Sequence, residues 1–232
     1  MRLLQLFTLL VSLLSPITSH AGSTVVVELF TSQGCSSCPP ADALLRDLSR
    51  EDKNIIALGW HVDYWDYLGW KDQFSKPEHT SRQAGYRDRW NLRTLYTPQM
   101  VIHGETQIVG SHARKARAAI RGFQAESAMI DMRVQVQNGR AQVRISPLVN
   151  NLPTADILLV HVTPEAHSDI ARGENAGKNI VYVNVVQDMS RLASWDGKTA
   201  IDVTGLDIST GAYILLVQAK NHGPILGAVN LR

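Results

Sequence analysis

The sequence stretch Thr31-Ser32-Gln33-Gly34-Cys35-Ser36-Ser37-Cys38-Pro39-Pro40 contains the two cysteines of the chain, separated by two residues. A disulfide between cysteines this close cross-links too little chain to be an efficient structural staple. A redox or metal-binding role is therefore favoured for the pair.

The residues on either side of the cysteines predict a parallel βαβ unit. Residues 24–30 are apolar and rich in β-branched side chains, as expected for a buried strand. Residues 41–50 carry apolar side chains at helical spacing, and residues 54–60 form a second apolar strand. The loops after parallel strands emerge at one edge of the sheet, where ligands usually bind. The cysteine loop and residues 61–65 are therefore expected to lie together.

The rest of the first half predicts a helical insertion, a hairpin and a helix. Aromatic and basic residues alternate with polar ones over residues 65–91, which predicts an insertion at about 63–93 with a break at Pro77. Residues 95–102 and 106–109 predict a hairpin with His103-Gly104 in its turn. Residues 112–124 predict a helix with basic residues on its exposed face.

This order of elements, with Thr97-Pro98 before the hairpin, resembles the thioredoxin-like fold. The resemblance implies a cis-proline at Pro98 opposite the cysteines, and cis peptide bonds are largely confined to X-Pro. Residues 28–42, 62–66 and 96–101 also resemble a family of exported bacterial proteins that have a thioredoxin-like domain and no assigned function. That resemblance extends over most of the chain after residue 21, and it implies a fold without naming a reaction.

The second half predicts a β-rich unit. Residues 131–137 and 140–146 alternate polar and apolar side chains around Asn138-Gly139, which indicates a type I′ hairpin. Further strands are expected at 156–163, 180–186, 200–203, 212–219 and 226–231. The predicted fold class is thus an α/β thioredoxin-like domain with a helical insertion over 22–126, followed by an antiparallel β-sandwich-like domain over 127–232.

The N-terminus predicts export to the periplasm or secretion. Met1-Arg2, an apolar stretch at 3–14 and small residues ending at Ala21 are typical of a signal peptide over residues 1–21. Loss of Arg2 with the signal lowers the formal charge from +2 to +1. A near-neutral protein gives no electrostatic reason to expect nucleic acid or an anionic membrane as a partner. No membrane span is expected after signal cleavage.

The two cysteines are expected to have different roles. Cys35 lies where the helix begins, so the helix dipole and unpaired N–H groups favour its thiolate and make it the nucleophile. Cys38, one turn further along, is the resolving thiol. The two prolines that follow it disfavour a helical conformation at Cys38 and predict a late helix start.

Four further residues complete the predicted site. Thr97 and Pro98 are expected to present backbone groups for edge pairing with an extended substrate. His61 is a candidate proton carrier or thiolate partner, with a hydrogen-bonded strand-end histidine as its alternative. Asp63 is a candidate for proton transfer to Cys38, with a loop-capping carboxylate as its alternative.

Three functions fit these residues. The first is an exported thiol-disulfide oxidoreductase without a cofactor, which acts on exported protein thiols or disulfides, uses a separate redox partner protein, and docks or forms a homodimer through the β domain. The second is a copper-binding or delivery protein in which Cys35 and Cys38 act with His61 or His103, because thiolates suit Cu(I). The third is a non-catalytic binding module with a fixed disulfide.

Overall fold

The computed structural model of the protein describes residues 24–231. The predicted signal peptide at 1–21 lies outside the described residues. In chain order the elements are β1 (Val25–Thr31), α1 (Pro39–Glu51), β2 (Ile55–His61), α2 (Pro77–Arg89), β3 (Gln99–Ile102), β4 (Thr106–Val109), α3 (Ala113–Gln124), β5 (Ile130–Gln137), β6 (Arg140–Pro147), β7 (Ala155–Asp169), β8 (Asn179–Trp195), β9 (Ile201–Asp207), β10 (Ala212–Ala219) and β11 (Ile225–Asn230).

The predicted βαβ unit and both predicted hairpins are confirmed. All seven residues of β1 are buried, and β1 pairs in parallel with β2 after the crossover through α1. β3 and β4 pair antiparallel around His103 and Gly104, whose φ angles are +53° and +71°. β5 and β6 pair around Asn138 and Gly139, at +52° and +72°, as a type I′ turn requires.

The predicted fold class is wrong, because the protein is mostly β and its strands form one large mixed sheet. The eight-stranded sheet has the order β11-β10-β7-β8-β2-β1-β3-β4, and strands from both halves of the chain belong to it. The junction is β2 beside β8, where Gly59 pairs with Val185 and the Asn184 side chain donates to the Ala57 carbonyl at 2.9 Å. An α/β thioredoxin-like domain followed by a β-sandwich is therefore not the architecture.

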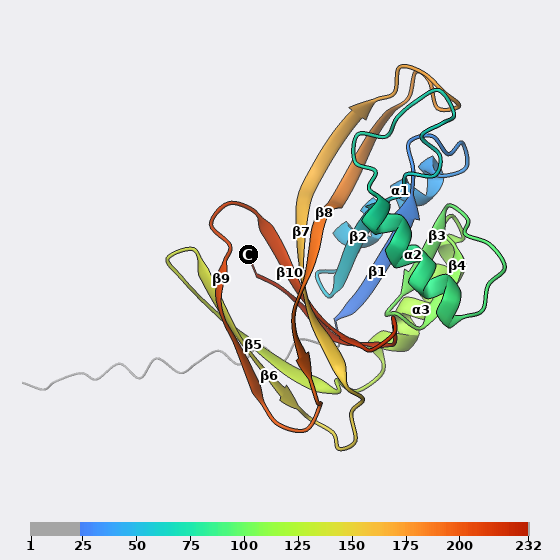
Figure 1. The fold of residues 1–232 in the computed structure, drawn as a ribbon. Coiled ribbons are helices and arrows are strands. Elements are labelled where there is room, and N and C mark those ends of the chain that lie inside the picture. The colour runs from blue at the N-terminus through green and yellow to red at the C-terminus, as the bar shows by residue number, and fades with distance from the viewer. Residues whose placement is uncertain (1–23, 232) are drawn as a thin grey trace, which may run out of the picture.

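β7 and β8 are also longer than expected. These strands contain 15 and 17 residues and run well past the expected strands at 156–163 and 180–186 (Figure 1). The added residues, 164–169 and 187–195, are mostly exposed or half-buried and contain no continuous apolar run, so they carry little strand signal. β8 meets β2 at Val185, inside the expected strand at 180–186, so the strand was predicted but its neighbour in the sheet was not.

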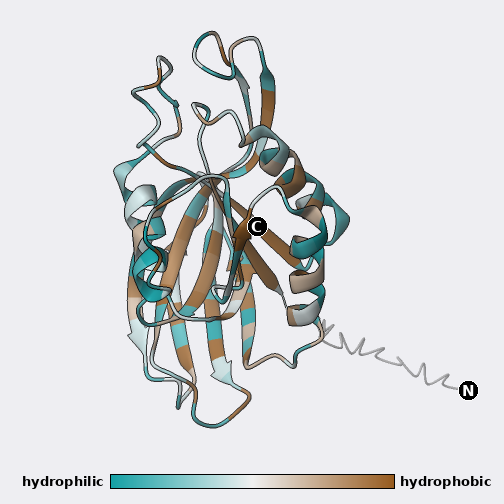
Figure 2. Cartoon of the chain, turned by 90° about the vertical axis from the view of Figure 1, so that its right-hand side faces the viewer, coloured by the Kyte–Doolittle hydropathy of each residue, from teal (hydrophilic) through white to brown (hydrophobic). Residues whose placement is uncertain are grey.

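Helices cover both faces of the sheet beside β1 (Figure 2). On one face α1 and α3 bury a core that includes Leu29, Leu45 and Ile120. On the other face α2 covers Phe30 and Trp60. Alternate residues of β1 point to the two faces of the sheet. Because helices cover both faces, every residue of the strand is buried.

A second sheet, β5-β6-β9, covers the remaining part of the large sheet. Its buried side chains meet those of β7, β10 and β11 in a separate apolar core that includes Val143, Ile145, Ile157 and Leu215. The division of the chain at residues 126 and 127 remains a prediction. No helix within residues 24–231 is long and apolar enough to cross a membrane.

A buried polar network ties β1, α2 and β10 together. Arg82 donates to the Glu28 carboxylate at 2.6 Å and to the Gln218 side-chain oxygen at 3.1 Å. The Tyr86 hydroxyl donates to the other Glu28 oxygen at 2.5 Å and accepts from Gln218 at 2.9 Å. At most 4% of each of these residues is exposed, so the ion pair is shielded from water.

Candidate functional site around the Cys35–Cys38 disulfide

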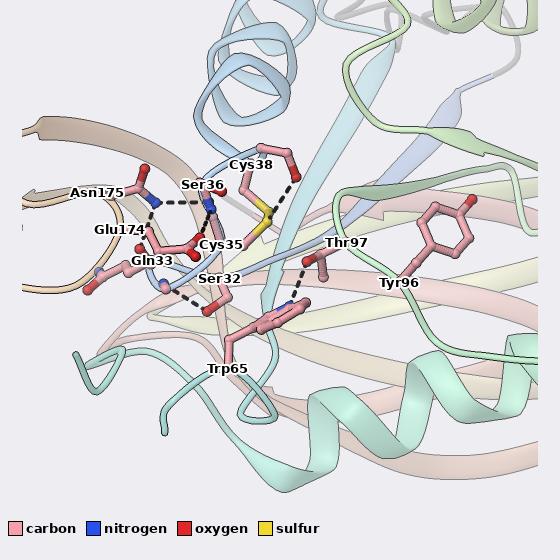
Figure 3. Close-up of a disulfide and its surroundings, with 12 residues drawn as sticks. Ser32, Gln33, Cys35, Ser36, Cys38, Trp65, Tyr96, Thr97, Glu174 and Asn175 are labelled. Carbon is pink, nitrogen blue, oxygen red and sulfur yellow. Dashed lines mark hydrogen bonds between the residues drawn. A yellow bond between two sulfur atoms is a disulfide. The ribbon is translucent and has the colours of Figure 1, made fainter. Parts of the chain in front are cut away.

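Cys35 and Cys38 form a disulfide, with their Cα atoms 5.4 Å apart. The pair lies in the loop between β1 and α1, and the two residues are unequally covered (Figure 3). Cys35 is 5% exposed and Cys38 is 0% exposed, while Ser36 and Ser37 between them are exposed. The Ser37 hydroxyl lies 3.3 Å from the Cys35 sulfur. Cys35 is therefore the more accessible of the two cysteines.

Helix α1 begins at Pro39, directly after the cysteines. Cys38 has helical dihedral angles of φ −79° and ψ −37°, so the expected late start of the helix is wrong. Neither proline has an N–H group, and the N–H groups of Ala41 and Asp42 both donate to the Cys38 carbonyl, at 2.8 and 3.1 Å. The start of α1 therefore offers a Cys35 thiolate fewer free N–H groups than an ordinary helix N-terminus.

Thr97 and Pro98 lie beside this loop, and the peptide bond between them is cis, as predicted. Trp65 links the two segments. Its ring N–H donates to the Thr97 hydroxyl at 2.8 Å, and a Cβ atom at Gly34 would lie only 3.0 Å from the Trp65 carbonyl (Figure 3).

Pro98 packs close to the start of α1, with Gly110 beside both. A Cβ atom at this glycine would lie 3.0 Å from Pro98 Cβ and 3.1 Å from Ala41 Cβ. The structure thus brings together four predicted site residues, the two cysteines, Thr97 and Pro98. The Tyr96 carbonyl accepts a hydrogen bond from Gln83 at 2.8 Å, so part of this backbone edge is already used within the protein.

His61 lies behind the cysteine loop in a buried ion pair. Its Nδ1 is 2.6 Å from the Asp72 carboxylate, and both side chains are fully buried. Burial disfavours the imidazolium, but the adjacent Asp72 outweighs burial and raises the pKa of His61. Burial likewise opposes the Asp72 carboxylate, yet His61 and backbone N–H groups hold the pKa of Asp72 below its ordinary value. One of those donors is the N–H of Gln33, at 2.8 Å, which connects the pair to the cysteine loop.

Asp42 lies in a small buried space lined also by Thr31, His61 and Tyr182. Burial raises the pKa of Asp42 to about 7, and the nearby His61 partly opposes this shift. One polar atom from each of these four residues has no hydrogen-bond partner among the described residues. Asp42 and Cys38 are four residues apart at the start of α1 and so share one face of the helix. A titrating carboxyl group therefore lies one turn from the buried cysteine.

The structure pairs Asp63 with helix α2 and places His103 away from the disulfide. The Asp63 carboxylate accepts a hydrogen bond from Thr80 of α2 at 2.5 Å. His103 lies near the start of β1, with its Nδ1 3.5 Å from the N–H of Val26, whereas the cysteines follow the end of that strand. The intervening strand separates His103 from the cysteine loop by about 17 Å.

The proposed copper ligands therefore do not come together around His103. Within residues 24–231, no group of three or more histidine, cysteine, aspartate or glutamate side chains is arranged to hold a metal ion.

The tip of the β7–β8 hairpin, residues 170–178, covers the cysteine loop. Asn175 is completely buried and donates to the carbonyls of Gln33 and Cys35, both at 2.8 Å. Lys178 donates to the Asn175 side-chain oxygen at 2.7 Å. The Glu174 carboxylate accepts from the N–H of Ser36 at 3.3 Å (Figure 3).

These hairpin residues lie outside the site that the sequence predicts. Asn175 and Glu174 belong to a polar, glycine-containing segment that is typical of any surface loop, so the sequence contained no signal for their role.

The chain is similar to one protein family and to two proteins of known structure. Residues 26–218 match a family model described as "Protein of unknown function (DUF1223)". No curated protein matches the chain. A crystal structure of a protein from Agrobacterium tumefaciens is similar at 29% identity and a TM-score of 0.77, over 92% of this chain and 96% of that one. HBP35 of Porphyromonas gingivalis shares the fold at 15% identity and a TM-score of 0.59, over 90% of this chain and 74% of that one.

Proposed function

Because the chain belongs to the DUF1223 family, whose description names no reaction, we propose a function from the site itself: thiol-disulfide exchange at Cys35 and Cys38. The observation that carries the proposal is the unequal exposure of the two cysteine residues, 5% for Cys35 and 0% for Cys38. A dithiol enzyme needs one sulfur that a substrate reaches and a second that resolves the mixed disulfide. The disulfide joins residues only three positions apart, so it contributes little as a cross-link.

In the oxidising direction, a substrate thiolate attacks the Cys35 sulfur and the Cys35–Cys38 bond breaks. Cys38 leaves as a thiolate, and the substrate sulfur is now bonded to Cys35. A second substrate thiolate then attacks the first substrate sulfur and releases the Cys35 thiolate. The substrate gains a disulfide, and the protein takes up two electrons as a dithiol, which a separate redox partner protein reoxidises. The reverse sequence reduces a substrate disulfide.

We place this reaction outside the cytoplasm. The signal-like residues 1–21 and a disulfide as the only cysteine pair both support an exported protein, since disulfides persist in oxidising compartments. The substrates proposed are exported protein thiols or disulfides.

One observation favours a second function, a binding module whose disulfide is permanent. Both cysteines are nearly covered, and the hairpin tip at 170–178 contributes to that cover. Low access slows attack on a disulfide. The reactivity of the disulfide therefore separates the two functions.

The experiment uses a matched pair of variants, Cys38→Ser and Cys35→Ser. Each purified protein is incubated with oxidised glutathione under native conditions, and adducts are counted by mass spectrometry. We expect Cys38→Ser to form a mixed disulfide rapidly through Cys35, and Cys35→Ser to react at least tenfold more slowly, because Cys38 is fully buried.

Wild-type protein in the oxidised form should also be reduced by glutathione in its native state. If neither variant forms adducts and the wild-type disulfide resists glutathione, thiol-disulfide exchange is excluded and the fixed-disulfide module remains.

A further inference from the structure

The tip of the β7–β8 hairpin puts a carboxylate directly at the entrance to the disulfide. The Glu174 carboxylate is 3.3 Å from the N–H of Ser36, the residue next to Cys35 (Figure 3). Glu174 and Ser36 are both exposed, so the carboxylate lies on the side from which a reagent approaches.

Asn175 fixes the backbone next to this carboxylate. Its amide group donates to Gln33 and Cys35, and its oxygen accepts from Lys178, so the polar atoms of this buried side chain are satisfied. The hairpin tip is also held on its other side, where a Cβ atom at Gly173 would lie 3.1 Å from Trp70 Cβ. Glu174 is therefore attached to an anchored segment and not to a freely moving loop.

Several backbone positions near Cys35 offer no hydrogen-bond donor to a negative charge on its sulfur. Glu174 occupies the Ser36 N–H group, and Pro39 and Pro40 supply none. Cys38 donates its own N–H to the Cys35 carbonyl at 3.1 Å. The Ser37 hydroxyl, 3.3 Å from the sulfur, is the polar side-chain contact that the structure gives the Cys35 sulfur.

We propose that Glu174 is a specificity-determining residue that makes the Cys35–Cys38 disulfide exchange preferentially with thiols next to positive charge. An attacking thiolate is itself anionic and approaches Cys35 past this carboxylate. A cationic group beside the thiolate pairs with Glu174, whereas an anionic group is repelled. The substrate class is thus a cysteine flanked by basic residues. This inference rests on the proposed thiol-disulfide exchange.

The experiment compares three small thiols as probes of charge. Oxidised wild-type protein is reacted with cysteamine, which is cationic, with 2-mercaptoethanol, which is neutral, and with glutathione, which is anionic. The second-order rate constant for opening of the disulfide is measured at low and high salt and normalised to thiolate concentration. A unit charge within on the order of 6 Å of a partly solvated reaction centre changes such rates by about three- to tenfold.

Glu174→Gln is the informative variant, because its amide oxygen can still accept from the Ser36 N–H while the charge is removed. We expect the rate ratio of cysteamine to glutathione to fall by about threefold or more in this variant. High salt should reduce the wild-type ratio in the same direction. Glu174→Lys should invert the preference.

Glu165→Gln is the matched control. Glu165 belongs to the same hairpin but pairs with Arg50 at 3.3 Å, in the last turn of α1. The length of α1, about 20 Å, separates the Glu165–Arg50 pair from the cysteines. An unchanged ratio in Glu174→Gln, or an equal change in Glu165→Gln, would overturn the inference while leaving the exchange reaction intact. A disulfide that reacts with none of the three thiols would instead contradict the proposed function itself.

Discussion

The pKa of the buried Asp42 carboxyl group is set by its surroundings. It faces the imidazole of His61, the hydroxyl groups of Thr31 and Tyr182 and, further away, the Asp72 carboxylate. Burial raises its pKa from 3.8 to about 7. The neutral acid is therefore the form that the folded protein prefers in mildly acidic solution.

This shift predicts a pH dependence of stability. Between about pH 4 and pH 7 the folded state retains a proton on Asp42 that the unfolded chain has lost. The contribution of Asp42 to stability is fully present below pH 3.8 and is lost as pH rises through about 7. Asp42→Asn should remove this dependence, on the order of 4 kcal/mol across the range. Urea unfolding of both proteins at several pH values measures the difference.

Asp47→Asn serves as the control for that series, because Asp47 is on the same helix and is exposed. Its pH profile should follow the wild type. Identical profiles for wild type and Asp42→Asn would show that Asp42 ionises normally in the folded protein.

At the scale of elements, the β7–β8 hairpin tip depends on Asn175. Asn175→Ala leaves the carbonyls of Gln33 and Cys35 without this donor inside the protein. An unsatisfied buried polar group costs about 1–3 kcal/mol, so we expect the tip to open more often. Trypsin should then cleave after the exposed residues Arg172 and Lys178 several-fold faster than in the wild type.

Asn179→Ala is the matched control for this measurement, since Asn179 donates to Asp169 on the exposed part of the same hairpin. Its cleavage rate should stay close to the wild-type rate. Equal acceleration in both variants would mean that Asn175 does not anchor the tip.

Among these elements, the sequence predicts the local turns and the βαβ unit but not the pairing of distant strands. Asn138-Gly139 and His103-Gly104 specify their turns locally, because both require positive φ angles, and the βαβ unit follows from short-range periodicity. The pairing of Gly59 with Val185 joins strands that are far apart in sequence. An apolar strand indicates that it is buried, but it does not identify its neighbour, so the single large sheet could not be predicted.

The candidate site divides in the same way. Cys35, Cys38 and Pro98 belong to short motifs whose residue types carry their chemistry, and the structure brings them together. Asp72 and Asn175 are ordinary polar residues of irregular segments, and only tertiary contacts bring them to the cysteine loop. Such residues have no periodicity or spacing that reveals them.

At the scale of the whole molecule, the Glu28–Arg82 ion pair connects elements from both halves of the chain. Glu28→Gln removes the charge that balances the buried Arg82, which also contacts Gln218 of β10. Loss of one partner of a buried ion pair costs about 3–5 kcal/mol. We expect the urea midpoint to fall accordingly, with circular dichroism and tryptophan fluorescence still giving the same midpoint, because the shared sheet unfolds as one unit.

Glu51→Gln is the comparison for this effect, since Glu51 pairs with Arg117 at the surface. An exposed ion pair contributes about 0–1 kcal/mol, so this variant should stay close to the wild type. Similar midpoints for the two variants would contradict a structural role for the buried pair.

The cover over the disulfide also has a consequence in time. Asn175 follows Cys35 by 140 positions, so during synthesis the cysteine loop leaves the ribosome long before the side chain that will cover it exists. Each new chain therefore passes through a stage in which neither thiol has this cover. Because the chain contains two cysteines, they have no wrong partner within the same molecule, and early oxidation yields the native bond. Synthesis of the hairpin after the cysteines therefore does not affect which cysteines pair.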